Sequence, residues 1–337
     1  MLLSGCGSEK VKPAEPKGKS YFAYFDTISY IYSYAGDSDK EFEKNCETAV
    51  AVLSRYNTLF DIYHEYSGVN NLCTLNKSAG GEPVVLDDEL LDFLEFAVDV
   101  CGRTDGAVNP MLGSVLQLWH QCRTEAEADP TDARIPEYSE LKDAAEHTDI
   151  SLLEIDRENH TARISDGRAS IDVGAIGKGY ATEKAAEALE AAGVNSYVLN
   201  IGGNIRIIGT RPDGSGWTTG VKDPKNPDGG ISAKIRISDT SCVTSGIYER
   251  YFVVDGEKYH HIIDKDTLYP SKYFSSVTVV TKDSGLADAL STALFCMDCS
   301  RGKELLAQFP DAEALWIYAD GTSEYTAGFQ KLEEAAE

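Results

Sequence analysis

The sequence predicts an α+β fold, with mostly antiparallel sheets flanked by helices. Two observations predict it. Apolar residues recur at helical spacing in most segments before residue 123, whereas short segments of strand pattern dominate from residue 152 to residue 280. Runs of helices followed by runs of strands favour this class over an alternating parallel fold. The chain has 337 residues, enough for one large domain or two smaller lobes.

The expected elements follow in order along the chain. Aromatic and small polar residues alternate over 21–34, which predicts an opening strand or hairpin. Amphipathic patterns predict helices at 41–60, from 87 onward, at 111–122, 176–192, 288–297 and 301–309. The polar segment 121–148 is expected to be a loop with one short helix. Short apolar runs predict strands at 152–155, 162–164, 197–200, 205–209, 217–221, 233–237, 251–254, 261–263, 276–280 and 314–318.

The formal net charge of −24 argues against nucleic-acid binding, because a phosphate backbone would be repelled. Acidic residues are spread along the chain, which is typical of a solvated surface. An anionic small molecule would therefore need a local basic group or a metal ion to bind. No run of 18 or more apolar residues predicts a membrane span.

The eight cysteines show no convincing zinc spacing. Cys296 and Cys299 form a lone C-x-x-C among apolar neighbours, which favours buried thiols over a redox pair. The remaining internal cysteines of the first half lie singly in apolar-periodic segments, and we expect them in the core: Cys46, Cys73, Cys101 and Cys122.

Cys6 differs from these, because Leu3-Ser4-Gly5-Cys6 resembles the lipobox of bacterial lipoproteins. The charged and long apolar regions of a signal peptide do not precede it, so we expect a sequence that starts late. Residues 7–20 are rich in Gly, Ser, Glu, Lys and Pro, as in a flexible tether. The predicted organisation is a lipobox remnant with a tether over 1–20 and a single functional domain over 21–337.

The segment from Asp172 to Ala181 combines an acidic residue, three glycines and Lys178 at the entrance of a predicted helix. Glycines there let the backbone approach a ligand, and free N–H groups favour an anion. Neither common nucleotide fingerprint is present. Taken alone, the segment is a weak signal for phosphate binding, because a Gly-rich strand-to-helix turn is often only a tight turn.

Several motifs in a fixed order carry a closer resemblance. They are Ser67-x-x-Asn70 to Asn76, Thr104-Asp105-Gly106-Ala107-Val108-Asn109-Pro110, Leu118-Trp119, Asp172-x-Gly174-x-Ile176-x-Lys178-Gly179-Tyr180-Ala181, Asn200-x-Gly202-Gly203-Asn204-Ile205, Lys222-Asp223-Pro224, Thr244-Ser245-Gly246-x-Tyr248-Glu249-Arg250, His260-His261-Ile262-Ile263-Asp264 and Ala287-Asp288-Ala289-Leu290-Ser291-Thr292-Ala293. Together they resemble the ApbE family, the FAD:protein FMN transferases, from about residue 21 to residue 318.

The resemblance implies a T-fold-related domain with an FAD cleft between two lobes. It also implies a Mg²⁺-dependent enzyme that splits FAD and attaches FMN, through a phosphoester, to a threonine or serine hydroxyl of a partner protein. AMP is then the leaving group. The implied acceptors are subunits of membrane redox complexes or extracytoplasmic flavoproteins. With the Cys6 lipobox, we expect the chain on the extracytoplasmic face of the bacterial cytoplasmic membrane, periplasmic or at the cell surface.

Asp288 and Thr292 are four residues apart, so on a helix they share one face. Their oxygens suit Mg²⁺ in a site completed by water and substrate phosphate oxygens. Asp288 can also simply start or cap a helix. The resemblance to the family favours its role as a metal ligand. It also maps a third ligand to Ala175, whose backbone carbonyl would serve.

The resemblance further assigns flavin or adenine contacts to a set of cofactor-binding residues. They are Phe25, Tyr63, Ala107, Val108, Asn109, Asp172, Lys178 and Ile262. Aromatic rings can stack on either ring system, although such residues are also common in cores. Lys178 can offset phosphate charge in this acidic protein. Asn109 stands where the family often has an aspartate.

His261 is expected to be catalytic together with Asp288. A histidine can take the proton of an attacking hydroxyl near neutral pH, and it can also support a strand. Both roles stay open for His261. After it, Lys265 and Leu268 replace a proline and a glycine of the family pattern, so the turn following Asp264 can differ in shape.

Two alternatives to the transferase remain. A Mg²⁺-dependent FAD pyrophosphatase would use the same site and release FMN to water. A flavin-binding lipoprotein without turnover would need no metal pair, so Asp288 and Thr292 count against it.

Overall fold

The computed structural model describes residues 15–336, and the Cys6 lipobox lies outside this range. The helices are α1 (Asp39–Phe60), α2 (Leu72–Lys77), α3 (Asp88–Arg103), α4 (Gly113–Ala128), α5 (Tyr138–Ala145), α6 (Gly177–Ala191), α7 (Ser284–Phe295), α8 (Cys299–Leu306) and α9 (Ala327–Glu334). No helix of this part of the chain is both long and apolar enough to cross a membrane.

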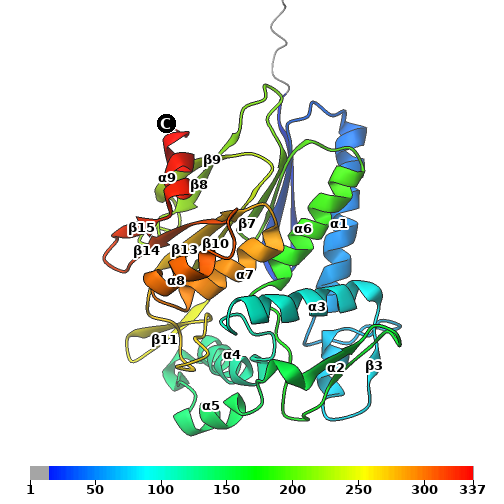
Figure 1. Cartoon of the computed structure of the whole chain (residues 1–337), viewed down its shortest axis with the longest axis vertical. Coiled ribbons are helices and arrows are strands. Elements are labelled where there is room, and N and C mark those ends of the chain that lie inside the picture. Colours follow the sequence, from blue (N-terminus) through cyan, green and yellow to red (C-terminus); the bar gives the residue numbers. More distant parts are fainter. Residues whose placement is uncertain (1–14, 337) are drawn as a thin grey trace, which may run out of the picture.

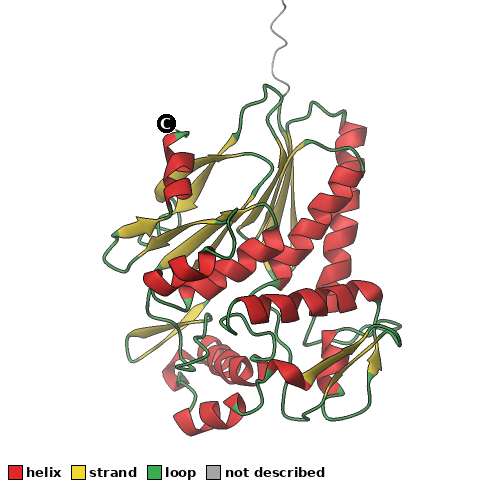
Figure 2. Ribbon diagram, viewed as in Figure 1, coloured by secondary structure: helices red, strands yellow, loops and turns green. Residues whose placement is uncertain are grey.

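The strands fall into one large sheet and three small ones. They are β1 (Lys17–Tyr24), β2 (Thr27–Ser33), β3 (Val84–Val85), β4 (Leu153–Asp156), β5 (Thr161–Ile164), β6 (Ser196–Ile201), β7 (Asn204–Gly209), β8 (Trp217–Lys222), β9 (Ile231–Ile237), β10 (Ser241–Gly246), β11 (Tyr251–Val254), β12 (Glu257–His260), β13 (Ser276–Thr281), β14 (Glu313–Ile317) and β15 (Ser323–Tyr325). Figure 2 shows the sheet and its helices by class.

The large sheet is eight-stranded, in the order β1-β2-β6-β7-β10-β13-β14-β15, and its paired neighbours are antiparallel. The predicted α+β class with mostly antiparallel sheets is therefore confirmed. Helices α1, α6 and α7 pack against one face of this sheet, whereas β8, β9 and α9 cover the other (Figure 1). Helices α2, α4 and α5 and the small sheets β3-β5-β4 and β11-β12 lie toward the end of the molecule that is away from α9.

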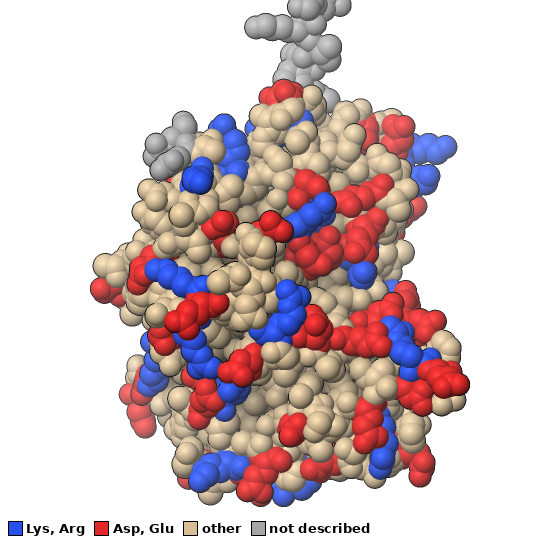
Figure 3. Space-filling view, in the orientation of Figure 1, with Lys and Arg blue, Asp and Glu red and all other residues tan. Residues whose placement is uncertain are grey.

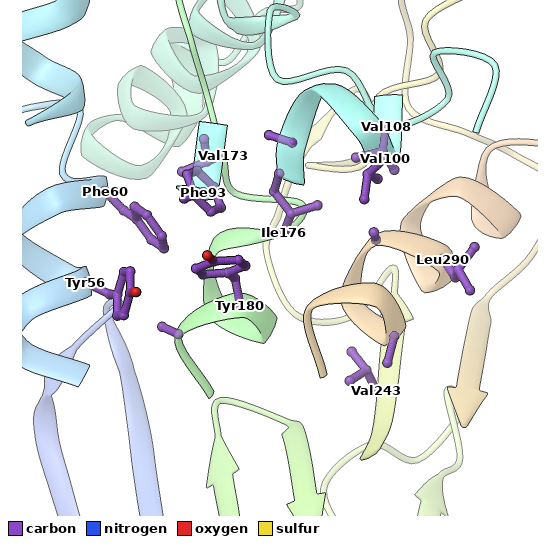
Figure 4. Close-up of a cluster of buried hydrophobic side chains, with 14 of the residues drawn as sticks. Tyr56, Phe60, Phe93, Val100, Val108, Val173, Ile176, Tyr180, Val243 and Leu290 are labelled. Carbon is purple, nitrogen blue, oxygen red and sulfur yellow. The ribbon is translucent and has the colours of Figure 1, made fainter. Parts of the chain in front are cut away.

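The main core lies between the large sheet and α1, α3, α6 and α7. At its centre the ring of Tyr180 packs against Tyr56, Phe60 and Phe93, with ring centroids 5.6, 6.3 and 5.0 Å away (Figure 4). Tyr180 follows Gly179 in the first turn of α6. The start of this helix is thus anchored in the core on the side of α1 and α3.

Strand β10 and helix α9 were not expected, and several other elements differ from expectation at their boundaries. The first strand begins at Lys17, so residues 17–20 of the expected tether belong to the sheet. Helix α4 continues to Ala128, past the expected loop start at residue 121. Helix α7 begins at Ser284, four residues before the expected start, because Asp283 caps it by accepting from Leu286 N. Strand β12 ends at His260, so His261 follows a strand and is not within one.

The seven cysteines of the described part are all free thiols, and Cys296 and Cys299 form no disulfide. Cys46, Cys73, Cys101, Cys122 and Cys299 are buried as expected, whereas Cys296 is only half-buried. On the face drawn in Figure 3, acidic and basic side chains are interspersed, as expected for a solvated surface.

Candidate active site

A cleft of about 500 Å³ opens where the large sheet meets α4 and the β11–β12 hairpin. Segments far apart in the sequence line it, including the Ala107–Asn109 loop, the Asp172–Lys178 loop, β10 and α7. Among the predicted site residues, all but Phe25 line this cleft: Tyr63, Ala107, Val108, Asn109, Asp172, Ala175, Lys178, His261, Ile262, Asp288 and Thr292.

Asp288 lies at the contact between α6 and α7, and only 5% of its surface is exposed. Its Oδ2 accepts a hydrogen bond of 2.8 Å from the backbone N–H of Gly179. That N–H belongs to the first turn of α6, where no intrahelical acceptor exists. Among the described residues, Oδ1 makes no hydrogen bond. The carboxylate is therefore fixed by one oxygen and can offer the other to a cation.

Gly179 is required by this contact. A Cβ atom at this position would lie 2.3 Å from the carbonyl oxygen of Ser284 and 2.4 Å from the Cβ of Asp288. Any side chain here would push the two helices apart. The glycine of the Gly-rich motif thus allows α7 to bring its carboxylate against the N-terminus of α6.

Thr292 lies one turn after Asp288 on α7, so both side chains face the cleft. Its hydroxyl is 3.4 Å from Ser245 Oγ, which also lies 2.8 Å from Ser291 Oγ. The family-implied ligand at Ala175 also lines the cleft. Among the described residues, no group of three or more His, Cys, Asp or Glu could hold a metal by itself.

The loop before α6 and the first turn of that helix contribute an acidic and a basic side chain to the cleft. Asp172 Oδ1 accepts from Gly174 N at 2.8 Å. Burial raises the pKa of Asp172, although this hydrogen bond and the nearby His120, Arg250 and Arg123 oppose the shift. Lys178 lines the same cleft and supplies positive charge beside it.

His261 follows β12 and keeps solvent contact inside the cleft. Its Nδ1 is 3.2 Å from the carbonyl oxygen of Arg250. Because a carbonyl only accepts, Nδ1 must carry the proton in this contact, which leaves Nε2 of the neutral ring as an acceptor. Surrounding protein atoms, and secondarily the charge of Lys178, lower the pKa of His261 from 6.5 to about 3. The imidazole is therefore neutral at physiological pH.

The neighbouring His260 has a different role. It is 7% exposed, its Nε2 lies 2.8 Å from the carbonyl oxygen of Ser271, and its Nδ1 accepts from Ile262 N at 3.2 Å. Both ring nitrogens are thus used within the fold. Of this pair, only His261 has a ring nitrogen free for a ligand among the described residues.

Aromatic and basic side chains form the wall on the side of α4. The ring of Tyr63 lies 5.4 Å from that of His120, whose Nδ1 is 2.7 Å from Arg123 Nη2. Burial, and then the charge of Arg123, lower the pKa of His120. Trp119 stacks on Tyr259 of the hairpin at 5.8 Å and donates from Nε1 to the carbonyl oxygen of Leu268.

The apolar predictions are mostly placed at the same cleft. Val108 and Ile262 are nearly buried, and each presents an edge to it. Asn109 lines the cleft as well, but its amide holds the loop: Nδ2 donates to Thr148 O at 2.7 Å and Oδ1 accepts from Met111 N at 2.9 Å. This accounts structurally for an asparagine at the position.

Phe25 is the predicted site residue that does not line the cleft. It packs against the main core in a left-handed conformation (φ 53°), and its N–H donates to Asn57 Oδ1 at 2.8 Å. Its neighbours Asp26 and Thr27 line the cleft instead. Aromatic character in the sequence could not distinguish a ring in the core from one in the cleft.

Several titratable residues of the cleft were not singled out as site residues, among them the basic residues His120, Arg123, Lys222 and Arg250. Lys222 and Arg250 belong to motifs that carry the family resemblance, so their motif membership was an available signal. His120 and Arg123 follow the Leu118-Trp119 motif on α4. Only the structure shows that the face of α4 that carries them lines the cleft.

Comparison with known proteins gives the family. The sequence profile of the ApbE family matches residues 26–316. The chain belongs to the ApbE family. A FAD:protein FMN transferase of Treponema pallidum is 32% identical over 271 residues, covering 76% of this chain and 73% of that protein. One from Vibrio cholerae is 30% identical over 336 residues, covering 97% and 94%.

Solved structures agree with this assignment. The ApbE protein of Thermotoga maritima matches with a TM-score of 0.83 and 30% identity, over 95% of this chain and 99% of that chain. The flavin transferase ApbE of Vibrio cholerae matches with a TM-score of 0.77 and 26% identity, over 95% and 100%. The expected ApbE-like fold is thus confirmed over nearly the whole chain.

Proposed function

We propose that this ApbE-family transferase uses Mg²⁺ to transfer FMN from FAD to a threonine or serine hydroxyl of an acceptor protein. Flavin transfer itself rests on the family and on relatives that carry this name. The observation that supports the chemistry is the meeting of Asp288, Thr292, Lys178 and His261 in one cleft. The acceptor oxygen bonds to the phosphorus of the FMN half, the pyrophosphate P–O bond breaks, and AMP leaves.

The oxygen donors fit Mg²⁺. Asp288 offers a carboxylate oxygen, Thr292 a hydroxyl and Ala175 a carbonyl, all hard oxygen ligands. Three protein donors leave positions for water and for diphosphate oxygens, as is usual for Mg²⁺ sites that act on phosphates. When bound, the ion supplies charge stabilisation at the phosphoryl oxygens.

His261 suits the role of general base. In its neutral form with Nδ1 protonated, Nε2 can accept the proton of the acceptor hydroxyl as that oxygen attacks. The depressed pKa keeps it unprotonated, although it also makes it a weaker base. The negative charge of substrate phosphates beside His261 would raise the pKa of its imidazole in the bound complex, which brings that pKa closer to neutral pH.

Four basic residues around the cleft would bind the diphosphate: Lys178, Lys222, Arg123 and Arg250. In a protein with a net charge of −24, such a local cluster is what an anionic ligand requires. The exposed ring of Tyr63 offers a stacking surface to flat ring systems, whereas Trp119 is buried in the same wall.

A single assay tests the proposal against both alternatives. The protein is incubated with FAD, Mg²⁺ and a target domain with an acceptor threonine, and the same domain with valine there serves as control. Flavin fluorescence on the threonine target in a denaturing gel, with one AMP per flavin attached, is the expected result. AMP and free FMN without labelled target would indicate a pyrophosphatase. Bound FAD without AMP would indicate a flavin-binding protein.

We also propose that Cys6 carries the lipid anchor, with acceptors in membrane redox complexes or extracytoplasmic flavoproteins. The support is the Leu3–Cys6 lipobox and the tether-like composition after it. Fatty-acid labelling of cells expressing the chain with its signal peptide tests this. Cys6→Ser should lose the label and leave the membrane fraction, and a variant that keeps both would refute the anchor.

A further inference from the structure

A second hydrogen bond joins α6 and α7 one helical turn from the Gly179–Asp288 contact. Glu183 on α6 accepts from the backbone N–H of Ser284, the first residue of α7, with an Oε2–N distance of 2.7 Å. Gly179 and Glu183 are four residues apart, as are Ser284 and Asp288. The two contacts therefore form two rungs between the same helix faces.

Arg206 on β7 holds Glu183 in place. Its guanidinium is 1% exposed, and its Nε lies 3.2 and 3.0 Å from the two carboxylate oxygens of Glu183. Nη2 donates to Glu190 at 3.0 Å and Nη1 to Asp239 at 3.2 Å. A guanidinium does not deprotonate in proteins, so Glu183 faces a permanent positive charge.

Helices α6 and α7 are closely packed where they cross. Besides the close approach at Gly179, a Cβ at Gly285 would lie 3.2 Å from the Cα of Tyr180. Tyr180 is itself anchored in the core (Figure 4). Helix α6 is thus a fixed reference, and the Glu183–Ser284 contact sets where α7 begins against it. Asp288 and Thr292 follow one and two turns later on α7.

We propose that Glu183, held by Arg206, is a positioning residue that places Asp288 and Thr292 for the metal ion. Neither Glu183 nor Arg206 lines the cleft, so neither touches the substrate. The inference rests on the proposed magnesium site. A positioning role differs from a purely structural one in its consequence: the folded fraction of a Glu183 variant should bind the metal ion more weakly than the wild type.

Two variants break the same contact from opposite sides. Glu183→Gln leaves one oxygen for two donors and removes the charge that faces Arg206. Ser284→Pro removes the N–H, and its ring Cδ takes the place of the hydrogen that Glu183 accepts, so the carboxylate is pushed away from α7. The position is the first of the helix, where proline is favoured, and Asp283 before it has the extended backbone that proline requires (φ −79°, ψ 124°). Ser284→Pro leaves the charges of Glu183 and Arg206 unchanged, so it remains decisive if Glu183→Gln fails to fold.

Glu190→Gln is the matched control, since it weakens another carboxylate partner of Arg206 that makes no contact with α7. Mn²⁺ binding with FAD present is measured by electron paramagnetic resonance, together with melting temperature. We expect Glu183→Gln and Ser284→Pro to weaken Mn²⁺ binding by about 10- to 100-fold, as for partners that orient metal ligands. Glu190→Gln should bind Mn²⁺ like the wild type. Saturating Mg²⁺ should restore most of kcat in both test variants.

Three outcomes would overturn the inference. If both test variants bind Mn²⁺ normally while Asp288→Ala does not, Glu183 is only structural and the magnesium proposal stands. If Glu190→Gln weakens Mn²⁺ binding as much as Glu183→Gln, the effect comes from the whole Arg206 cluster. If wild type and Asp288→Ala bind Mn²⁺ equally poorly, the metal assignment fails and the positioning role fails with it.

Discussion

The two walls of the cleft are built on opposite principles. The α6–α7 wall is made of glycines and small residues at close contact, and backbone N–H groups fix its polar side chains. The wall of α4 and the β11–β12 hairpin consists of large rings at 5 to 6 Å from one another, such as Trp119, Phe252 and Tyr259. Among the described strands, β11 and β12 pair only with each other.

This difference matches what we propose that each wall holds. A metal ion with few protein ligands requires oxygens at fixed positions, so a rigid helix contact suits it. A flat ring system needs a broad apolar surface and tolerates small displacements. We therefore expect substitutions in the first wall to act on turnover, and those in the second to act on FAD affinity.

The largest expected effect is that of Asp288→Ala. The fold should persist, but losing the single carboxylate among the proposed ligands should abolish metal-dependent turnover, since the ion supplies several kcal/mol. Initial rates of AMP release across a Mg²⁺ titration provide the measurement. Asp283→Ala, which removes the cap of the same helix, is the control: it should cost about 1 kcal/mol of stability and retain turnover. Full activity of Asp288→Ala would refute the metal assignment.

Replacing His261 by glutamine should lower the rate of transfer by about 10²- to 10⁴-fold with little change in FAD affinity. The measurements are transfer rate, FAD binding and melting temperature on the one variant. If His261 only supports the turn after β12, the folded fraction should instead keep its specific activity. Wild-type transfer in a stable, FAD-binding variant would make Asp264 the next residue to test.

The depressed pKa of His261 also predicts a pH effect. The unfolded state takes up a proton near pH 6.5, whereas the folded state does so only near about pH 3. Stability contributed by this residue is therefore lost as pH falls below 6.5, and His261→Gln should lose less over that window. Denaturant unfolding of both proteins at several pH values measures this, and parallel curves would contradict the low pKa. For the free enzyme, kcat/KM should show no inflection near pH 6.5 from this group.

Gly179→Ala should separate the two helices of the first wall. The added Cβ has no room between Ser284 and Asp288, so we expect a loss of about 1–3 kcal/mol of stability together with weaker Mg²⁺ activation. The matched control is Gly102→Ala on α3, where no atom lies within 4 Å of the added Cβ. That change should be neutral or stabilising by up to about 1 kcal/mol. Equal melting temperatures for the two variants would contradict the close contact.

The smallest effect is expected in the second wall. Tyr63→Ala should raise KM for FAD by about tenfold, the loss of roughly 1–3 kcal/mol of ring stacking, and leave kcat nearly unchanged. Tyr63→Phe keeps the ring and should behave like the wild type. A fall in kcat without a change in KM would assign Tyr63 to the chemistry instead of to binding.

Periodicity predicted the long amphipathic helices and most sheet strands, because α1 and α3 each bury one regular face. It missed β10, whose sequence Ser-Cys-Val-Thr-Ser-Gly has no clear alternation. That strand lies between β7 and β13 inside the large sheet, so its place depends on neighbours that are distant in the sequence. It also missed α9, whose apolar Phe329 is buried in the smaller core cluster as the helix packs against β9 and β14.

The site divides in the same way. Asp288 and Thr292 could be paired by helical spacing alone, because both lie on one face of one helix. His261, Tyr63 and Asp172 come from unrelated segments, so only the order of the family motifs brought them together before the structure did. The Glu183–Ser284 contact carried no sequence signal, since an acid on a helix is ordinarily solvated.

The order of strands in the large sheet has a consequence for synthesis of the chain. The opening hairpin pairs with β6, where Ser29 faces Ile201, and the cleft takes its last lining residue from Thr292. Such non-local pairings form slowly and late. A nascent chain that has emerged only as far as β13 would already have most of the aromatic wall but neither proposed side-chain ligand for the ion. The cleft therefore cannot be completed until the chain has been made past Thr292.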